Sequence, residues 1–153
     1  MFLGPISYVD RNDSFIIANS AFALESFKYQ NLAIAGNGGK ESQDMSHGRR
    51  LVADWSVGLG EPVLQLQVIR SMDKEEPASI IVLSRQAVSA ILDTGGMLWS
   101  KRLEFPPRTI LSFSSMMYDK RIISLISSDS GSLMFYDNTT LKWASQLQHK
   151  PIW

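Results

Sequence analysis

The 153-residue sequence contains no cysteine. This absence excludes a disulfide framework, thiolate catalysis and a zinc site with cysteine ligands. The sequence also lacks an excess of charge of either sign, because 15 Lys and Arg residues balance 15 Asp and Glu residues. A neutral chain of this kind offers neither a basic arm for nucleic acid nor a polybasic patch for a membrane surface, so neither is expected as a direct partner.

Targeting and membrane-spanning signals are missing as well. The start, MFLGPISYVDRND, has no basic region followed by a long apolar region, and so does not read as a signal peptide. The longest fully apolar runs are about four residues, far below the ~20 needed to cross a bilayer. Hydrophobic residues nevertheless make up 44% of the chain, enough to build a sizeable core. The sequence therefore predicts a folded, cytoplasmic protein.

Residues for catalysis or metal binding are scarce. The two histidines, His47 and His149, have no second histidine at ligand spacing, and no Gly-x-Ser-x-Gly motif is present. The glycine-rich segment 36–40 lacks the first glycine of a phosphate-binding loop, and Glu41 stands where that loop needs Ser or Thr. We therefore expect no enzyme activity, with no catalytic, cofactor-binding or metal-binding residue and no small-molecule substrate.

What the sequence does contain is an internal repeat. Three tryptophans follow one another at intervals of 44 residues, and each has a leucine four residues later. The six positions are Trp55 and Leu59, Trp99 and Leu103, and Trp143 and Leu147. A period of ~40–45 residues with one Trp per unit is typical of the four-stranded blades of a β-propeller. We interpret the six residues as structural repeat positions, with each Trp on the fourth strand of its blade and packed between neighbouring sheets.

Strand patterns within each unit agree with this interpretation. Segment 63–69 alternates apolar and polar residues, which indicates a half-buried strand, and 79–83 is a short apolar run suited to a strand covered on both faces. The other strands predicted for the second and third units are 87–92, 97–103, 109–114, 122–127, 132–136 and 141–147. Short polar turns between them favour antiparallel meanders.

The first unit shows the same strands in a stretched form. Its predicted strands are 6–9, 14–18, 22–34 and 49–59, with a flexible polar loop at 36–48 and no helix. The fold class is therefore all-β, a partial β-propeller of about three four-stranded antiparallel blades. We expect one domain over 1–153, with blade units at about 1–61, 62–106 and 107–153.

Specific segments also resemble a known family. Residues 13–35, 48–66 and 141–151, above all the stretches ESFKYQ, RLVADW and LKWASQL, are similar to the N-terminal propeller of the Bardet–Biedl syndrome protein nine family. This family is the parathyroid-hormone-responsive B-one subunit of the BBSome. The resemblance covers nearly the whole chain. It also implies that the chain begins after the first blades and ends before the later domains, as a fragment, splice form or truncated gene model would.

The resemblance implies a function that the repeat alone does not. Members of the family are non-catalytic scaffold subunits of the BBSome, a coat-like complex that carries membrane proteins to and from cilia. The expected partners are other BBSome subunits, with a membrane touched only through the complex. The expected location is the cytoplasm, the cilium, the ciliary membrane and the basal body or centriolar region.

Two other interpretations of the propeller pattern remain open. One is a generic interaction scaffold outside the BBSome, although the Trp-Asp ending of WD repeats is absent because Asp54 precedes Trp55. The other is an enzyme, because segment 90–103 is similar to the Trp-docking repeats of quinoprotein dehydrogenases. In that segment Thr94 and Gly95 follow Asp93 two residues too early for those repeats.

Overall fold

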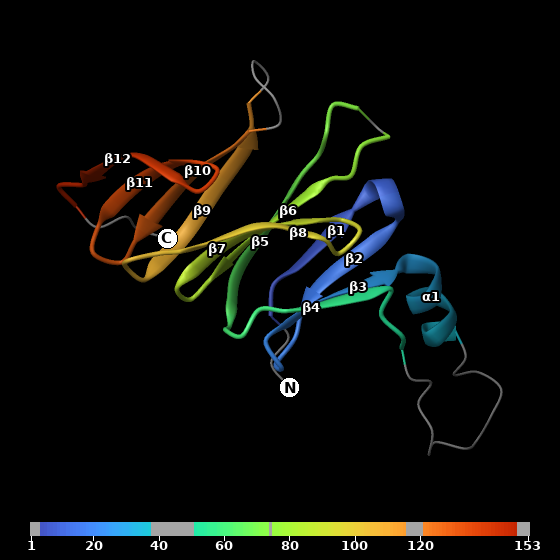
Figure 1. The fold of residues 1–153 in the computed structure, drawn as a ribbon. Helices are drawn as coiled ribbons and strands as arrows, with labels where there is room; N and C mark the ends of the chain where they lie inside the picture. The colour runs from blue at the N-terminus through green and yellow to red at the C-terminus, as the bar shows by residue number, and fades with distance from the viewer. Residues whose placement is uncertain (1–3, 38–50, 74, 116–120, 150–153) are drawn as a thin grey trace.

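The fold is seen in a computed structural model that describes residues 4–37, 51–73, 75–115 and 121–149. Three four-stranded sheets follow one another along the chain (Figure 1). The first blade contains β1 (Ile6–Val9), β2 (Ser14–Ala18), β3 (Ala23–Lys28) and β4 (Trp55–Gly58). The second contains β5 (Val63–Ile69), β6 (Ser79–Ser84), β7 (Ala87–Leu92) and β8 (Met97–Arg102). The third contains β9 (Pro107–Ser114), β10 (Ile122–Ser128), β11 (Ser132–Asp137) and β12 (Thr140–Gln146).

Within each blade, every strand pairs antiparallel with the next strand in the chain. The prediction of three four-stranded antiparallel blades is therefore confirmed. A short 3-10 helix (Asp10–Asn12) lies in the first turn.

Two predicted strands of the first blade are partly wrong. The strand expected over 22–34 ends at Lys28, and an α-helix, α1 (Tyr29–Asn37), follows it directly. Helix-favouring Gln, Leu and Ala residues fill this helix, and the apolar character of the segment concealed the change of period. The strand expected over 49–59 is β4 alone, because Leu51 and Val52 are exposed and unpaired. The loop predicted at 36–48 lies outside the described residues from 38 onward, and its first two residues end α1.

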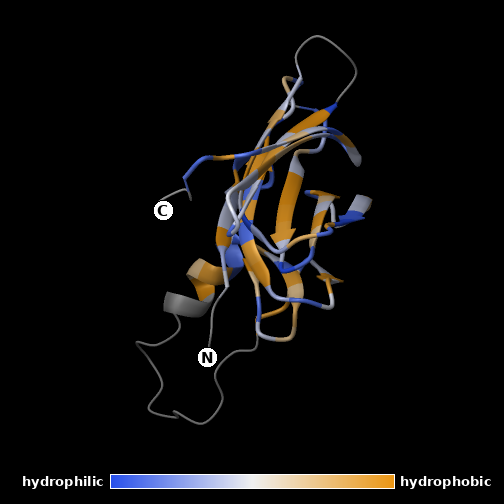
Figure 2. Cartoon of the chain, turned by 90° about the vertical axis from the view of Figure 1, so that its left-hand side faces the viewer, coloured by the Kyte–Doolittle hydropathy of each residue, from blue (hydrophilic) through white to orange (hydrophobic). Residues whose placement is uncertain are grey.

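The hydrophobic core is divided between the two blade interfaces. Strand β6 shows the division clearly: Ile80 and Val82 belong to the core shared with the first blade, while Ile81 and Leu83 belong to the core shared with the third. All four side chains are fully buried, as expected for an apolar strand covered on both faces. Figure 2 shows that most of the hydrophobic colouring lies along the strands. Contact between successive blades, rather than within one sheet, therefore forms the core.

The first strands of the blades, β1, β5 and β9, lie next to one another. Two glutamines of β5 join it to β9. The Gln65 amide accepts from Ile110 N at 3.1 Å and donates to Ile110 O at 2.9 Å, and Gln67 contacts both polar groups of Ser112 in the same way. Each side-chain amide thus replaces the peptide group that a neighbouring strand would supply.

Candidate functional site

Titratable side chains do not gather into a reactive centre in the part of the chain that the structure describes. No group of three His, Asp or Glu residues there could hold a metal ion, and no helix there is long and apolar enough to cross a membrane. Tyr8 donates to Asp13 Oδ1 at 2.8 Å, and this bond raises the pKa of its phenol. Burial, and then the charge of Glu104, raise the pKa of Tyr136. Both tyrosines are protonated at neutral pH, so neither is an activated nucleophile.

The repeat residues instead mark how each blade meets the next. Trp55, at the start of β4, rests on the turn between β7 and β8 of the second blade. Its Nε1 donates to Asp93 O at 2.9 Å. Gly95 adopts a φ of +94°, and a Cβ added there would lie 2.9 Å from Trp55 Cγ. Glycine is therefore required both by the backbone conformation and by the close approach of the indole.

The β7–β8 turn against which Trp55 packs is also held in place by an ion pair between Arg11 and Asp93. The Asp93 side chain is fully buried, and its Oδ2 accepts from Ala78 N at 3.1 Å. Arg11, in the first blade, lies 3.3 Å from the same oxygen and donates to Glu75 O at 3.0 Å. The ion pair and the tryptophan thus join the first and second blades at one turn.

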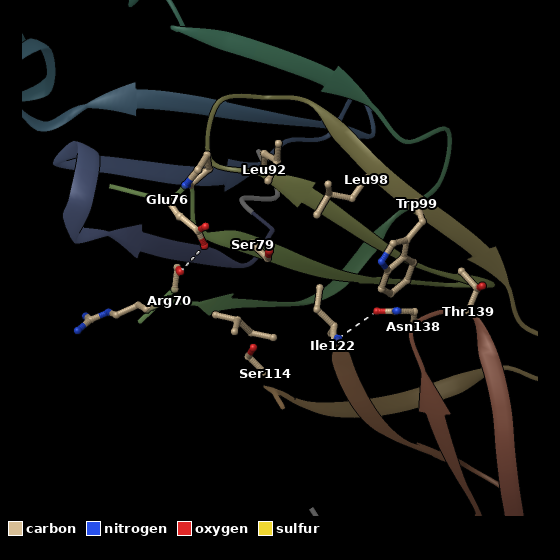
Figure 3. Close-up of a pocket in the computed structure, with 13 residues that line it drawn as sticks. Arg70, Glu76, Ser79, Leu92, Leu98, Trp99, Ser114, Ile122, Asn138 and Thr139 are labelled. Carbon is tan, nitrogen blue, oxygen red and sulfur yellow. Dashed lines mark hydrogen bonds between the residues drawn. The ribbon is translucent and has the colours of Figure 1, made fainter. Parts of the chain in front are cut away.

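Trp99 lies on the fourth strand of the second blade, as Trp55 does in the first, but the turn near it, between β11 and β12, is shorter. It packs against the core between the second and third blades and lines a groove of about 540 Å³ (Figure 3). The β11–β12 turn beside it is formed by Asn138 and Thr139 and has no glycine. No described residue accepts a hydrogen bond from Trp99 Nε1, in contrast to Trp55.

Trp143, on β12, has no blade to meet within this chain. Its side chain is 45% exposed and stacks on Phe135, with ring centroids 5.4 Å apart and planes 8° apart. Leu125 pairs with Leu111 on one side and with Phe135 on the other, so one apolar row crosses all four strands. We call this outer face of the third blade the open face; its row is Leu111, Leu125, Phe135 and Trp143.

The leucines of the repeat show the same contrast in burial between the first two blades and the third. Leu59 packs against the core between the first two blades, and Leu103 is buried between the second and third. Leu147 is exposed. On the opposite end of the molecule, Ile6 and Tyr8 of the first blade are exposed too. Four of the six repeat positions thus pack between blades, and the two of the third blade, Trp143 and Leu147, are exposed.

Sequence reasoning missed the polar contacts between blades. Gln65 and Gln67 were placed on the polar face of their strand, with no sign that they pair with β9. Arg11 and Asp93 lie 82 residues apart, and no motif connects them. Asp93 and Asp137 both stand six residues before a Trp, but Asn138, not Asp137, makes the hydrogen bonds that correspond to those of Asp93.

Comparison with known proteins gives the family. A family model described as PTHB1 N-terminal matches residues 1–153. Protein PTHB1 of Homo sapiens is 34% identical over 153 residues, covering 97% of this chain and 17% of that protein. The pthb1 homolog of Caenorhabditis elegans is 25% identical over 151 residues, covering 97% of this chain and 18% of that protein. The chain thus spans less than a fifth of the curated relatives that it matches.

Solved structures that resemble the chain are propellers. The Neurospora crassa Pan2 WD40 domain has a TM-score of 0.62 and 16% identity, and the match covers 97% of this chain and 39% of that one. BBS1N, solved in complex with ARL6DN, has a TM-score of 0.59 and 13% identity, with 95% and 40% covered. At these identities the likeness shows the fold alone. The family match, in contrast, covers every residue and confirms the resemblance found in the sequence: the chain belongs to the PTHB1 N-terminal family.

Proposed function

We propose that this chain is part of a non-catalytic β-propeller scaffold in the BBSome, the coat-like complex for trafficking membrane proteins to and from cilia. The observation that carries the proposal is the family match over residues 1–153. The blade geometry supports it, because Trp55 and Trp99 pack against the cores between the blades. A solved neighbour with the same fold, BBS1N, was captured in complex with a protein, ARL6DN. We therefore expect protein partners, namely other BBSome subunits.

The proposed location follows from the proposed complex. We expect the chain in the cytoplasm, in the cilium and its membrane, and in the basal body or centriolar region. Contact with the membrane is expected only through the complex.

Affinity purification from ciliated cells, read by mass spectrometry, tests the proposal. The tagged chain is expected to enrich BBSome subunits over a tag-only sample. Ile80→Asp, which puts a charge at a fully buried position between the first two blades, is a matched control that should abolish the fold and the enrichment together. Enrichment of an unrelated coat, or of nothing above the tag alone, would contradict the BBSome assignment.

A generic propeller scaffold outside the BBSome is the alternative that the Pan2 WD40 likeness favours. The same purification distinguishes the two, because a generic scaffold would retain partners that are not BBSome subunits. A propeller dehydrogenase, NirN, also resembles the chain, with a TM-score of 0.56 and 14% identity, and this likeness shows the fold alone.

A further inference from the structure

The groove between the second and third blades arises from a difference in turn length. Four residues, 93–96, connect β7 to β8, whereas only Asn138 and Thr139 connect β11 to β12. The two turns begin alike: Asp93 exchanges hydrogen bonds with Ala78, and Asn138 exchanges the same pair with Ile122. The third-blade turn is thus anchored in the same way, but its anchor lies five residues before its tryptophan rather than six, and it lacks the glycine on which the preceding tryptophan rests.

Trp99 is half-buried, as Trp55 is, but its Nε1 lacks the acceptor that the longer turn supplies to Trp55. At Trp55, a backbone carbonyl lies 2.9 Å from Nε1 and a glycine lies flat against the ring. At Trp99 this place is the groove, whose wall includes Leu98, Ile122 and Asn138. Figure 3 shows these side chains at the Trp99 end of the groove and Glu76 at the far end. The volume of about 540 Å³ falls within the range of ligand pockets.

We infer that this groove is a docking site for a glycine-containing turn of a partner protein. The occupant gives a backbone carbonyl to Trp99 Nε1 and lays its glycine against the indole, as the Asp93–Gly96 turn does at Trp55. Trp99 and Ile122 already belong to the core between the second and third blades, so the docked turn extends an existing interface. Glu76, at the other end of the groove, accepts a hydrogen bond from Ser71 Oγ at 2.9 Å and takes no part in the docking (Figure 3).

This inference deepens the proposed scaffold function by naming a surface through which a partner binds. The two can fail separately. Purification of BBSome subunits does not depend on this groove, and binding of an isolated turn does not depend on which complex the chain enters.

A cyclic peptide with the chain's own turn sequence, Ile-Leu-Asp-Thr-Gly-Gly-Met-Leu, is the probe. It is titrated into the 153-residue chain carrying Leu111→Lys and Trp143→Lys on the open face, outside the groove, to limit self-association. The tryptophan Nε1–H resonances are followed by NMR and assigned with single Trp→Phe variants. We expect saturable movement of the Trp99 resonance and none at Trp55, whose acceptor is already in place. A second peptide with Val in place of the first Gly should not bind.

Two variants of the chain complete the test. Trp99→Phe keeps an aromatic ring but removes the donor. Because this variant has no Trp99 resonance, its binding is measured by isothermal titration calorimetry beside the parent chain, and the affinity for the probe is expected to fall roughly threefold to tenfold, the range for one hydrogen bond. Replacing Asn138–Thr139 by Asp-Thr-Gly restores the six-residue spacing between anchor and tryptophan. It is expected to fill the groove, raise the melting temperature by several degrees and abolish probe binding. A graft of equal length, Asp-Thr-Val, is the matched control and should not stabilise the chain.

Other outcomes would overturn the inference. One is a Trp99 resonance that stays in place up to several millimolar probe. Another is equal binding of the glycine and valine peptides, which would mean that the indole does not select the turn. A third is equal melting temperatures for the two grafts, which is measurable even if the probe is never added.

Discussion

At the scale of single residues, the absence of a Cβ at Gly95 lets the first two blades pack closely against each other. Gly95 has the backbone conformation that side chains disfavour, and it touches the Trp55 ring. Gly96 beside it is different: a Cβ there would lie 3.7 Å from Leu92 Cδ1, an ordinary contact, with no positive φ. The adjacent glycines thus form a natural pair for separating a packing requirement from the general effect of adding a methyl group to the turn.

Gly95→Val is predicted to lower the free energy of unfolding by about 2–4 kcal/mol, because it combines backbone strain with overpacking against the indole. Gly96→Ala is the control and is expected to change it by less than about 1 kcal/mol. Urea unfolding measures both. Equal midpoints for the two variants would show that Trp55 does not rest on Gly95.

At this scale the sequence predicted features that depend on local strand order, but not contacts between residues far apart in the chain. The 44-residue spacing placed all three tryptophans on fourth strands, since it reports local strand order. It could not show that Trp55, Trp99 and Trp143 have three different environments. Those environments depend on the length of a turn in the next blade and on whether that blade is present. Neither can be inferred from the residues next to each tryptophan in the sequence.

At the scale of elements, the inner strands β5 and β9 are joined by side chains rather than by a shared ladder. Ser112 is buried, and its N–H donates to Gln67 Oε1 at 2.8 Å while its carbonyl accepts from Gln67 Nε2. Its peptide group has no water to replace these bonds. The glutamine therefore satisfies polar groups that the fold would otherwise bury unpaired.

Gln67→Met keeps the length of the side chain but removes both bonds, and is predicted to lower the free energy of unfolding by about 1–3 kcal/mol. Gln30→Met, at an exposed position on α1, makes the same chemical change where no such pairing exists and should be nearly neutral. Chemical denaturation of the two variants is the measurement. A Gln67→Met chain as stable as the Gln30→Met chain would contradict the role assigned to this amide.

The segment between α1 and residue 51 supports a prediction from composition alone. Residues 36–48 include four glycines and a single apolar side chain, Met45. Because loop entropy grows only with the logarithm of length, removing 38–46 is predicted to shift the melting temperature by only a few degrees. Thermal unfolding followed by circular dichroism checks this. A chain that no longer folds after the deletion would mean that the segment contributes contacts of its own.

Strand prediction succeeded where periodicity was strong and failed where it weakened. The alternation in 63–69 and the apolar run 79–83 predicted β5 and β6 almost to the residue. The segment after Lys28 gave no such contrast, because Tyr29 and Leu32 fit a strand as well as a helix. Only the tertiary structure decides between the two periods for so short an apolar stretch.

At the scale of the whole molecule, three blades leave two sheet faces without neighbours in this chain. On the open face Leu111 is 59% exposed and Trp143 is 45% exposed, and at the other end Ile6 is 54% exposed. A propeller closes with at least ~4 blades, so these faces cannot meet one another in a ring of three. Exposed apolar surface of this kind favours association.

We therefore predict that the isolated 153-residue chain is marginally stable and either self-associates or stays soluble only with a partner. Sedimentation velocity combined with a thermal melt measures this. The double variant Leu111→Lys with Trp143→Lys is expected to reduce self-association, whereas Met72→Lys, at an 82% exposed position, serves as the control for added charge and should not. A monodisperse wild-type monomer that melts sharply above ~60 °C, beyond most mesophilic domains, would contradict this prediction.

The hydrogen bond from Trp55 Nε1 to the Asp93 carbonyl also implies an order in which the blades form during synthesis. Asp93 lies 38 residues beyond Trp55 in the chain, so it leaves the ribosome later. The hairpins of the first blade can pair as they emerge, because their strands are adjacent in sequence. Strand β4, however, must wait both for closure of the long segment after β3 and for the second blade to form the turn that receives its tryptophan. During synthesis the first blade is thus completed only after the second has formed its β7–β8 turn.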